Sequence, residues 1–186
     1  MILPIYAYGH HVLKKPGLEV NIDDPLLPQL IADMWESMYN AKGIGLAAPQ
    51  VGRSLRMFLV DTAQIEREDD DLEEGVKDVF INPNIIEETG EFWSNEEGCL
   101  SIRKLTGDVE RQESVTIGYL DSGFDRKVKT FTGMDARVIQ HEYDHIEGIL
   151  FTERLKPLKR RMINRKLENI KKGKVVAPYK MKFKKL

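Results

Sequence analysis

Cysteine is nearly absent from this sequence: Cys99 is the only one in 186 residues. A single thiol excludes an intramolecular disulfide framework and is more compatible with a reducing compartment than with secretion. No apolar run approaches the roughly 20 residues that a membrane-spanning helix requires. Residues 1–10 have no basic leader and are interrupted by Pro4, so we expect no signal peptide. These absences together predict a cytoplasmic protein without a membrane contact.

A strong net charge is also absent, because 28 Lys and Arg are balanced by 30 Asp and Glu. Nothing global therefore indicates nucleic acid as the main partner, and no specific reading of nucleic acid is expected. Residues 66–74 are acidic and almost without apolar side chains, which predicts a solvated loop, and they lack the spacing of a Ca²⁺ loop. The length favours one domain: we predict a catalytic domain at 1–172 and a basic C-terminal tail at 173–186.

Apolar residues at helical spacing predict two helices besides the one that carries the motif described below. The first is expected to have Asp24 as its N-cap and Pro25 at its first position, and to end near Ala41. The second spans 157–171 and is basic and amphipathic, so one face should pack on the core.

Apolar runs and period-two alternation predict the strands. The tail alternates apolar and Lys residues from 179 to 184, which favours an edge strand over a nucleic-acid contact. The other strands are expected at 56–61, at 79–86 as two pieces broken at Pro83, at 91–94, and as a β-hairpin at 114–120 and 127–131.

The segment 140–148, Q-H-E-Y-D-H-I-E-G, carries the most informative pattern. On a helix, His141 and His145 lie one above the other on the same face, within reach of a single metal ion. Glu142 lies beside them, placed to act on water at the metal rather than to bind the metal. A match to H-E-x-x-H also arises by chance on surface helices, so other parts of the chain must decide its meaning.

The same helix is predicted to begin after Thr132, a good N-cap, with Asp135 in its first turn, where the helix dipole favours negative charge. Met134 and Val138 precede His141 by seven and three residues, so they share its face of the helix. We expect both side chains to border the metal site and whatever binds there.

Cys99 lies in the segment E-G-C-L-S, residues 97–101. The commonest role of an unpaired cysteine is that of a small buried hydrophobic residue. The charged and small residues around Cys99 are unlike a core strand, and its thiolate would supply the third ligand that two histidines need. Three protein ligands with one position left for water is the catalytic arrangement, whereas a structural site is closed by four.

The segment 43–50, G-I-G-L-A-A-P-Q, has little side-chain bulk, so another backbone or a ligand can approach it closely. Gln50 adds an amide that both donates and accepts hydrogen bonds. The segment is equally compatible with an ordinary Gly-rich connection. It does not resemble a phosphate loop, because no lysine follows at the required spacing.

These three motifs, in this order, resemble those of the peptide deformylase family, and the similarity covers most of residues 1–170. The resemblance implies an α+β fold with mixed or antiparallel sheets packed around a central metal-binding helix and with a C-terminal helix. It also implies a metal-dependent hydrolase that removes the N-formyl group from the N-terminal formyl-methionine of newly synthesised polypeptides and releases formate. Its partners would be N-formyl-methionyl nascent chains. The basic C-terminal region, independently of the resemblance, suggests a ribosome contact.

The resemblance also implies a role for each motif residue. The metal would be one divalent ion per chain, Fe²⁺ by preference, with Zn²⁺, Ni²⁺ or Co²⁺ able to take its place. The implied roles are Cys99, His141 and His145 as metal ligands, Glu142 as general acid and base, Gln50 and the Leu100 N–H as oxyanion donors, Ile44 and Gly45 on the substrate backbone, and Glu97 paired with Arg111 as structural support. From this mechanism we also expect the methionine side chain in an apolar pocket bordered by Ile44, Met134 and Val138.

One departure from the family pattern follows the cysteine motif. The family commonly continues E-G-C-L-S with an apolar residue and a proline, whereas here Ile102 is followed by Arg103 and Lys104. Proline fixes φ and removes a hydrogen-bond donor, so its absence alters the segment that helps to bind substrate. The departure bears on substrate preference more than on the chemistry.

Two other functions are compatible with parts of the pattern. A zinc endopeptidase would use the same helix with a downstream carboxylate as third ligand, and Glu147, Glu153 and Glu168 are available. A ribosome-associated binding protein would use the basic helix and tail. No histidine follows His145, which argues against the endopeptidase. The presence of Cys99 and Gln50 together with the histidine motif argues against a binding protein that has lost its active site.

Overall fold

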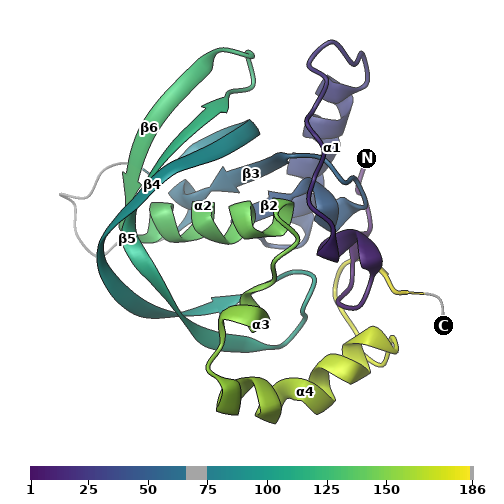
Figure 1. Ribbon diagram of the computed structural model, residues 1–186. Helices are drawn as coiled ribbons and strands as arrows, with labels where there is room; N and C mark the ends of the chain where they lie inside the picture. Colours follow the sequence, from purple (N-terminus) through teal and green to yellow (C-terminus); the bar gives the residue numbers. More distant parts are fainter. Residues whose placement is uncertain (66–74, 185–186) are drawn as a thin grey trace.

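The computed structural model describes residues 1–65 and 75–184, so the acidic loop predicted at 66–74 lies outside the described residues. A five-stranded antiparallel sheet wraps around one central helix, and a two-stranded parallel sheet and further helices flank it (Figure 1), which confirms the predicted α+β class. The elements are β1 (Ile5–Tyr6), η1 (His11–Lys14), α1 (Leu27–Asn40), β2 (Gly45–Ala47), η2 (Ala48–Val51), β3 (Met57–Asp61), η3 (Thr62–Gln64), β4 (Lys77–Gly98), β5 (Thr106–Leu120), β6 (Arg126–Thr132), α2 (Gly133–Ile146), α3 (Phe151–Arg154), α4 (Pro157–Lys171) and β7 (Met181–Lys182).

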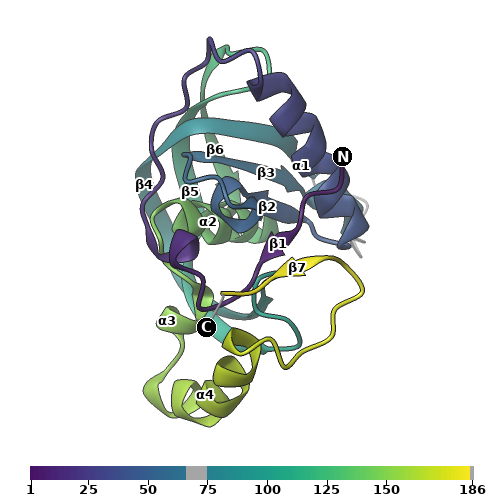
Figure 2. The ribbon, with the colours of Figure 1, turned by 90° about the vertical axis from the view of Figure 1, so that its right-hand side faces the viewer.

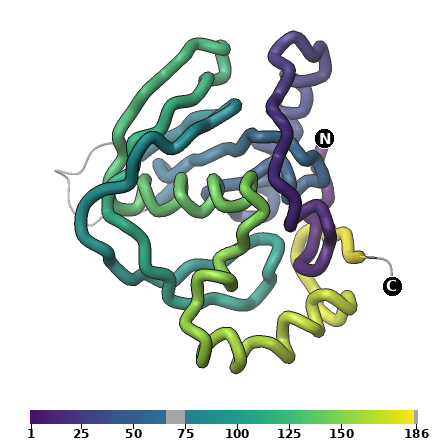
Figure 3. Tube along the Cα trace, in the orientation of Figure 1, coloured from purple at the N-terminus to yellow at the C-terminus, as the bar shows by residue number. Residues whose placement is uncertain are grey.

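Strands β2 to β6 are neighbours in sequence order, and the two long strands β4 and β5 curve together around α2 (Figure 3). Shifts of register interrupt their pairing, and such bulges let a long strand pair bend. The predicted break at Pro83 and the separate strand at 91–94 are wrong, because β4 runs through both. Pro83 lies in the shift between Ile81 and Asn84, where its missing N–H costs no ladder hydrogen bond. The predicted hairpin is confirmed as β5 and β6.

Helix α2 fills the inside of the curved sheet. Its apolar side, which includes Ala136 and Ile139, packs with buried side chains of β3 and β5 in one core cluster. The helix begins after Thr132 as predicted, although the Thr132 side chain makes no capping bond to any described residue. Asp135 lies in the first turn and accepts a hydrogen bond from the Thr62 hydroxyl instead. The other side of the helix is left to polar groups.

Helix α1 begins later than the sequence predicts. Asp24 is not its N-cap, since the helix starts at Leu27. The Asp24 carboxylate accepts the Leu26 N–H in a turn that precedes the helix. Pro28 takes the place in the first turn that was expected for Pro25. Both are local errors, because a short Asx turn and a helix N-terminus share the same residue preferences.

The C-terminal segment packs beside the N-terminal arm (Figure 2). Strand β7 pairs in parallel with β1, and the Ala7 N–H donates to the Lys182 carbonyl. The predicted edge strand is therefore confirmed, and the helix predicted at 157–171 corresponds to α4. None of the helices in the described ranges has the length and apolar character that a membrane crossing requires.

Candidate metal centre and active site

Three potential metal ligands converge from two distant parts of the chain. Cys99 follows the end of β4, while His141 and His145 lie one turn apart on α2. Their sulfur and ring nitrogen atoms all lie within 4.8 Å of one another, and Cys99 Sγ is 3.2 Å from His145 Nε2. Both histidines are buried. Thiolate and imidazole are preferred ligands of divalent transition metals, so this donor set fits one such ion.

Glu142 is buried beside this cluster and faces Gly45. A Cβ added to Gly45 would lie 2.5 Å from Glu142 Oε1, so the carboxylate can occupy this position only because residue 45 is glycine. Glu142 Oε2 has no hydrogen-bond partner in the part of the chain that the structure describes. Burial raises the pKa of Glu142 to about 7, although the charge of His141 opposes the rise. A carboxyl group with such a pKa can take up and release a proton near neutral pH.

Gln50, on η2, directs its amide group toward Cys99. Its Oε1 accepts the Ala47 N–H at 2.8 Å, which fixes the orientation of the side chain. The Nε2 atom then lies 3.4 Å from both Cys99 Sγ and Ser101 Oγ. The result is a side-chain N–H donor held at the edge of the ligand cluster.

Leu100 places a second N–H beside the same cluster. Among residues 1–65 and 75–184 its N–H has no acceptor. Its carbonyl, in contrast, accepts the Tyr179 hydroxyl at 2.9 Å. Burial raises the pKa of Tyr179 to about 12, so this hydroxyl remains a donor at neutral pH. The C-terminal segment therefore reaches the candidate site, a contact that sequence reasoning missed.

The carboxylate of Glu97 positions His141. Glu97 Oε2 lies 2.9 Å from His141 Nδ1, and Arg111 binds the same carboxylate through two nitrogens at 2.7 and 3.0 Å. Burial alone would raise the pKa of Glu97, but the hydrogen bonds from His141 and Arg111 outweigh it and hold this pKa well below its usual range. An anionic acceptor at Nδ1 leaves His141 Nε2 as the nitrogen available to a metal. The predicted pairing of Glu97 with Arg111 is thus present.

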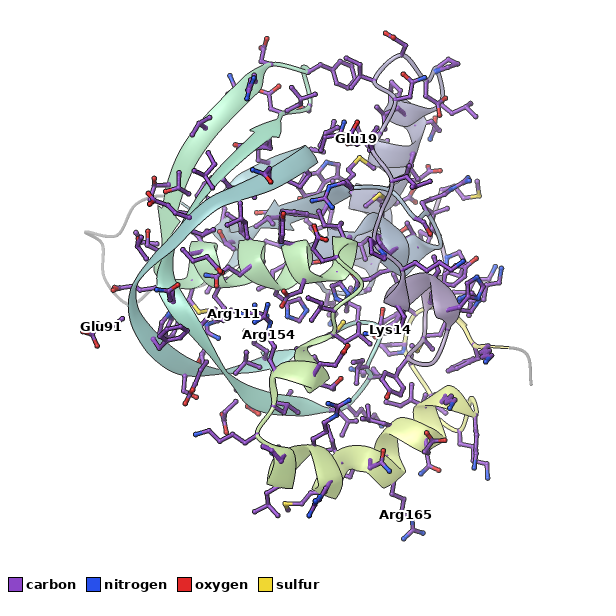
Figure 4. The ribbon with its side chains drawn as sticks, viewed as in Figure 1. Lys14, Glu19, Glu91, Arg111, Arg154 and Arg165 are labelled. Carbon is purple, nitrogen blue, oxygen red and sulfur yellow. The ribbon has the colours of Figure 1, made fainter. Side chains whose placement is uncertain are left out.

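A further arginine and aspartate complete this buried network. Arg137 donates to Glu97 at 2.9 Å and lies 4.1 Å over the Trp93 ring. Arg111 and Arg154 both donate to Asp144, at 2.9 and 2.6 Å. Figure 4 labels these two arginines below α2. Sequence reasoning missed Arg137, although it precedes His141 by four residues and so shares its helix face. Asp144 follows His141 by three residues, so its place on the same helix face could also have been predicted from the sequence.

The ligand cluster opens into a cavity of about 370 Å³. The four residues predicted to bind substrate contribute to its wall, as do Arg103 and Lys104. The predicted site residues that line it are Ile44, Gly45, Gln50, Glu97, Cys99, Leu100, Met134, Val138, His141 and Glu142.

Comparison with known proteins decides the family. The family model for polypeptide deformylases matches residues 2–161. The chain belongs to the polypeptide deformylase family. A peptide deformylase of Christiangramia forsetii is 54% identical over 98% of this chain and 96% of its own length. The deformylase structure from Legionella pneumophila has a TM-score of 0.81 and 38% identity, covering 94% of this chain and 98% of that one. An Acinetobacter baumannii deformylase solved with Met-Ala-Ser bound is 37% identical, covers 83% of this chain and 99% of that one, and has a TM-score of 0.75.

Membership makes this chain an enzyme of a defined class. Deformylases are metal-dependent hydrolases that remove the N-formyl group from an N-terminal formyl-methionine. The carboxylates that an endopeptidase would need as third ligand are engaged elsewhere. Glu147 pairs with Arg56 at 2.6 Å and Glu153 with Lys14 at 2.5 Å, while Glu168 lies 3.7 Å from Lys171.

Proposed function

We propose that this deformylase holds one divalent metal ion with Cys99, His141 and His145 and moves the reaction proton with Glu142. The observation that carries the proposal is the convergence of the three ligand atoms within 4.8 Å, beside a buried carboxylate and at a cavity. The family preference makes Fe²⁺ the expected ion, with Zn²⁺, Ni²⁺ or Co²⁺ as replacements. When bound, such an ion acts as a Lewis acid and makes water nucleophilic near neutral pH.

Glu142 accepts the proton of the attacking water and delivers it to the nitrogen of the leaving amine. The C–N bond of the formamide breaks, and formate and a free N-terminal amine are released. Two features support this role: the pKa of about 7 that burial gives the carboxyl, and the absence of any hydrogen-bond partner for Oε2 among the described residues. Proton transfer by a positioned side chain typically contributes about 10²–10⁴-fold to a rate.

The formyl oxygen gains negative charge as water attacks, and Gln50 Nε2 and the Leu100 N–H are the proposed donors to it. Gln50 is suited to this because the Ala47 N–H fixes its orientation. The loss of one such donor typically costs about 2.7–4 kcal/mol of transition-state stabilisation. Ile44 and Gly45 are proposed to hold the substrate backbone.

The methionine side chain is proposed to enter the apolar part of the cavity, which Ile44, Met134 and Val138 line. The related Acinetobacter baumannii structure holds Met-Ala-Ser, a peptide with an N-terminal methionine, and this supports a methionyl pocket. Formyl is the smallest acyl group, so a close approach of Gly45 to Glu142 also favours it over larger acyl groups.

The proposed setting is the cytoplasm, where nascent chains emerge from ribosomes. Helix α4 supports a contact with the ribosome, because it exposes Arg160, Arg161 and Arg165 to solvent. Cosedimentation with ribosomes should then fall as salt rises. Cosedimentation that persists after deletion of residues 173–186 would assign the contact to the helix rather than to the tail.

The deciding experiment pairs two measurements on one anaerobic preparation: metal content, and formate release from formyl-Met-Ala-Ser. We expect one ion per chain and formate release that is lost with a chelator and restored by Fe²⁺. Cys99→Ala should lose or weaken the metal. Full metal occupancy in that variant, or cleavage of internal peptide bonds by the parent enzyme, would overturn the proposal.

A further inference from the structure

Four cationic side chains surround a second hollow, next to the cavity of the candidate active site. Arg103 and Lys104 lie on the turn before β5, whereas Lys166 lies on α4 and Lys174 on the segment that follows it. Figures 1 and 2 both place this turn beside the C-terminal end of α4. The hollow has a volume of about 360 Å³, and its lining among the described residues contains no carboxylate.

No carboxylate of the described residues neutralises the charge of this cluster, and Arg103 has only the ring of Tyr179 beneath it, at 5.9 Å. In the described ranges none of these four side chains forms an ion pair, whereas Lys156, the N-cap residue of α4, lies 3.3 Å from Glu110. The Arg103 Nε atom is buried and has no hydrogen-bond partner there either. A concave group of like charges concentrates its field and attracts ions of opposite charge. The hollow is therefore suited to an anionic group.

The hollow shares a wall with the cavity that Glu142 lines. Arg103, Lys104 and Leu105 line both. An extended peptide advances by about 3.3 Å per residue, so a chain whose formyl group lies at Glu142 reaches this wall within a few residues. We infer that the hollow binds acidic side chains of the substrate downstream of formyl-methionine, so that the enzyme favours nascent chains with early Asp or Glu. This inference rests on the proposed function.

The lining favours a peptide over RNA as the source of the anionic group. Single-stranded nucleic acid is bound by basic grooves in which aromatic side chains stack on the bases. The hollow is lined by Leu105, Ile170 and Val175 between its charged groups and by no aromatic residue among those described. Its connection to the catalytic cavity through Arg103 and Lys104 also places it along the path of the substrate chain.

The test uses the full-length, metal-loaded enzyme and amidated peptides of the series formyl-Met-Ala-Ala-Ala-Ala. Each alanine in turn is replaced by Asp or by Lys. Exposed ion pairs are weak, so we expect kcat/KM to favour Asp over Lys by about three- to tenfold at one or two positions, and less at high salt. The double variant Lys166→Gln/Lys174→Gln should reduce this ratio. Arg165→Gln should not, because Arg165 points away from the body of the protein (Figure 4).

A binding measurement separates this inference from the proposed function. Fluorescent unformylated peptides that differ only in Asp or Lys at the selected position are titrated into each variant, with no turnover required. An enzyme that fails to deformylate the all-alanine peptide contradicts the proposed function, whereas equal binding of the Asp and Lys peptides overturns the acidic subsite. The acidic subsite would also be overturned if a labelled RNA oligonucleotide bound the parent but not the double variant, while the ratio of kcat/KM for Asp and Lys peptides was the same in both enzymes.

Discussion

At the scale of single residues, Glu142 can occupy its buried position because residue 45 is glycine and has no side chain. Its carboxyl group is buried against Gly45, so its charged form is poorly solvated and its pKa rises to about 7. An ordinary surface glutamate has a pKa of about 4.3 and would be a much weaker base at neutral pH. The same five-residue motif on an exposed helix would therefore lack this property.

Replacement of Glu142 by Gln should abolish the proton transfer and leave the metal site intact. Gln has nearly the same shape but can neither accept nor deliver a proton under these conditions. We expect kcat on formyl-Met-Ala-Ser to fall by about 10²–10⁴-fold, with metal content unchanged. Turnover near that of the parent, at full metal content, would reject Glu142 as the acid and base.

Gly45→Ala tests the close approach itself. The added Cβ would lie 2.5 Å from Oε1 and 2.8 Å from Cγ of Glu142, so the buried carboxylate must move. Overpacking of this kind costs about 1–3 kcal/mol of stability. Because the catalytic carboxylate would be misplaced, we expect kcat/KM to fall by more than about tenfold. Gly118→Ala is the matched control, since its nearest neighbour would be at 3.7 Å. Equal effects of the two substitutions on kcat/KM would contradict the claim that Glu142 requires glycine at position 45.

At the scale of elements, a buried charge network joins α2 to the two long strands. Glu97 near the end of β4 binds Arg111 on β5 and both Arg137 and His141 on α2. The two contacts with α2 join residues that are separated by 40 and by 44 positions in the sequence. The network therefore sets the orientation of a proposed metal ligand and the packing of three elements together.

Glu97→Gln should weaken both the fold and the metal site. Removal of the charge leaves Arg137 facing a neutral group and leaves Arg111 with only its contact to Asp144, and breaking a buried ion pair typically costs about 3–5 kcal/mol. Loss of the carboxylate behind His141 should lower metal affinity by about 10–100-fold. Unfolding by denaturant and a metal competition titration measure the two effects. Glu96→Gln, an exposed neighbour bonded to Thr106, should change stability by no more than about 0.5 kcal/mol.

The elements also show where sequence reasoning succeeds. Helical spacing of apolar residues identified α1 and α4, and alternation identified the hairpin and β7, because each buries one face against a neighbour. The continuity of β4 through Pro83 was not predictable, since a bulge depends on pairing with β5. The charged and small residues around Cys99 suggested it as the third ligand. Helical spacing alone places Arg137 on the face of His141, but its bond to Glu97 and the role of Tyr179 depend on tertiary contacts that no local pattern specifies.

At the scale of the whole molecule, the C-terminal segment pairs with the N-terminal arm and reaches the candidate site. Strand β7 pairs with β1, and Tyr179 just before β7 bonds the carbonyl of Leu100, next to Cys99. The family model matches residues 2–161, so this contact comes from beyond the matched region. The division into a catalytic domain at 1–172 and a tail at 173–186 stays a prediction, and these contacts give it a direct test.

Tyr179→Phe removes one hydroxyl and leaves the ring in place. The buried Leu100 carbonyl then lacks its donor, which should cost about 0.5–1.5 kcal/mol of stability. Because Leu100 is the proposed backbone donor to the formyl oxygen, a displaced peptide unit should lower kcat by up to about tenfold, with little change in KM or metal content. Deletion of residues 173–186 should lower kcat at least as much and reduce the free energy of unfolding further, since β1 also loses its partner. A truncated enzyme with full activity and unchanged stability would show instead that residues 1–172 are self-sufficient, and Tyr179 would then have only a peripheral role.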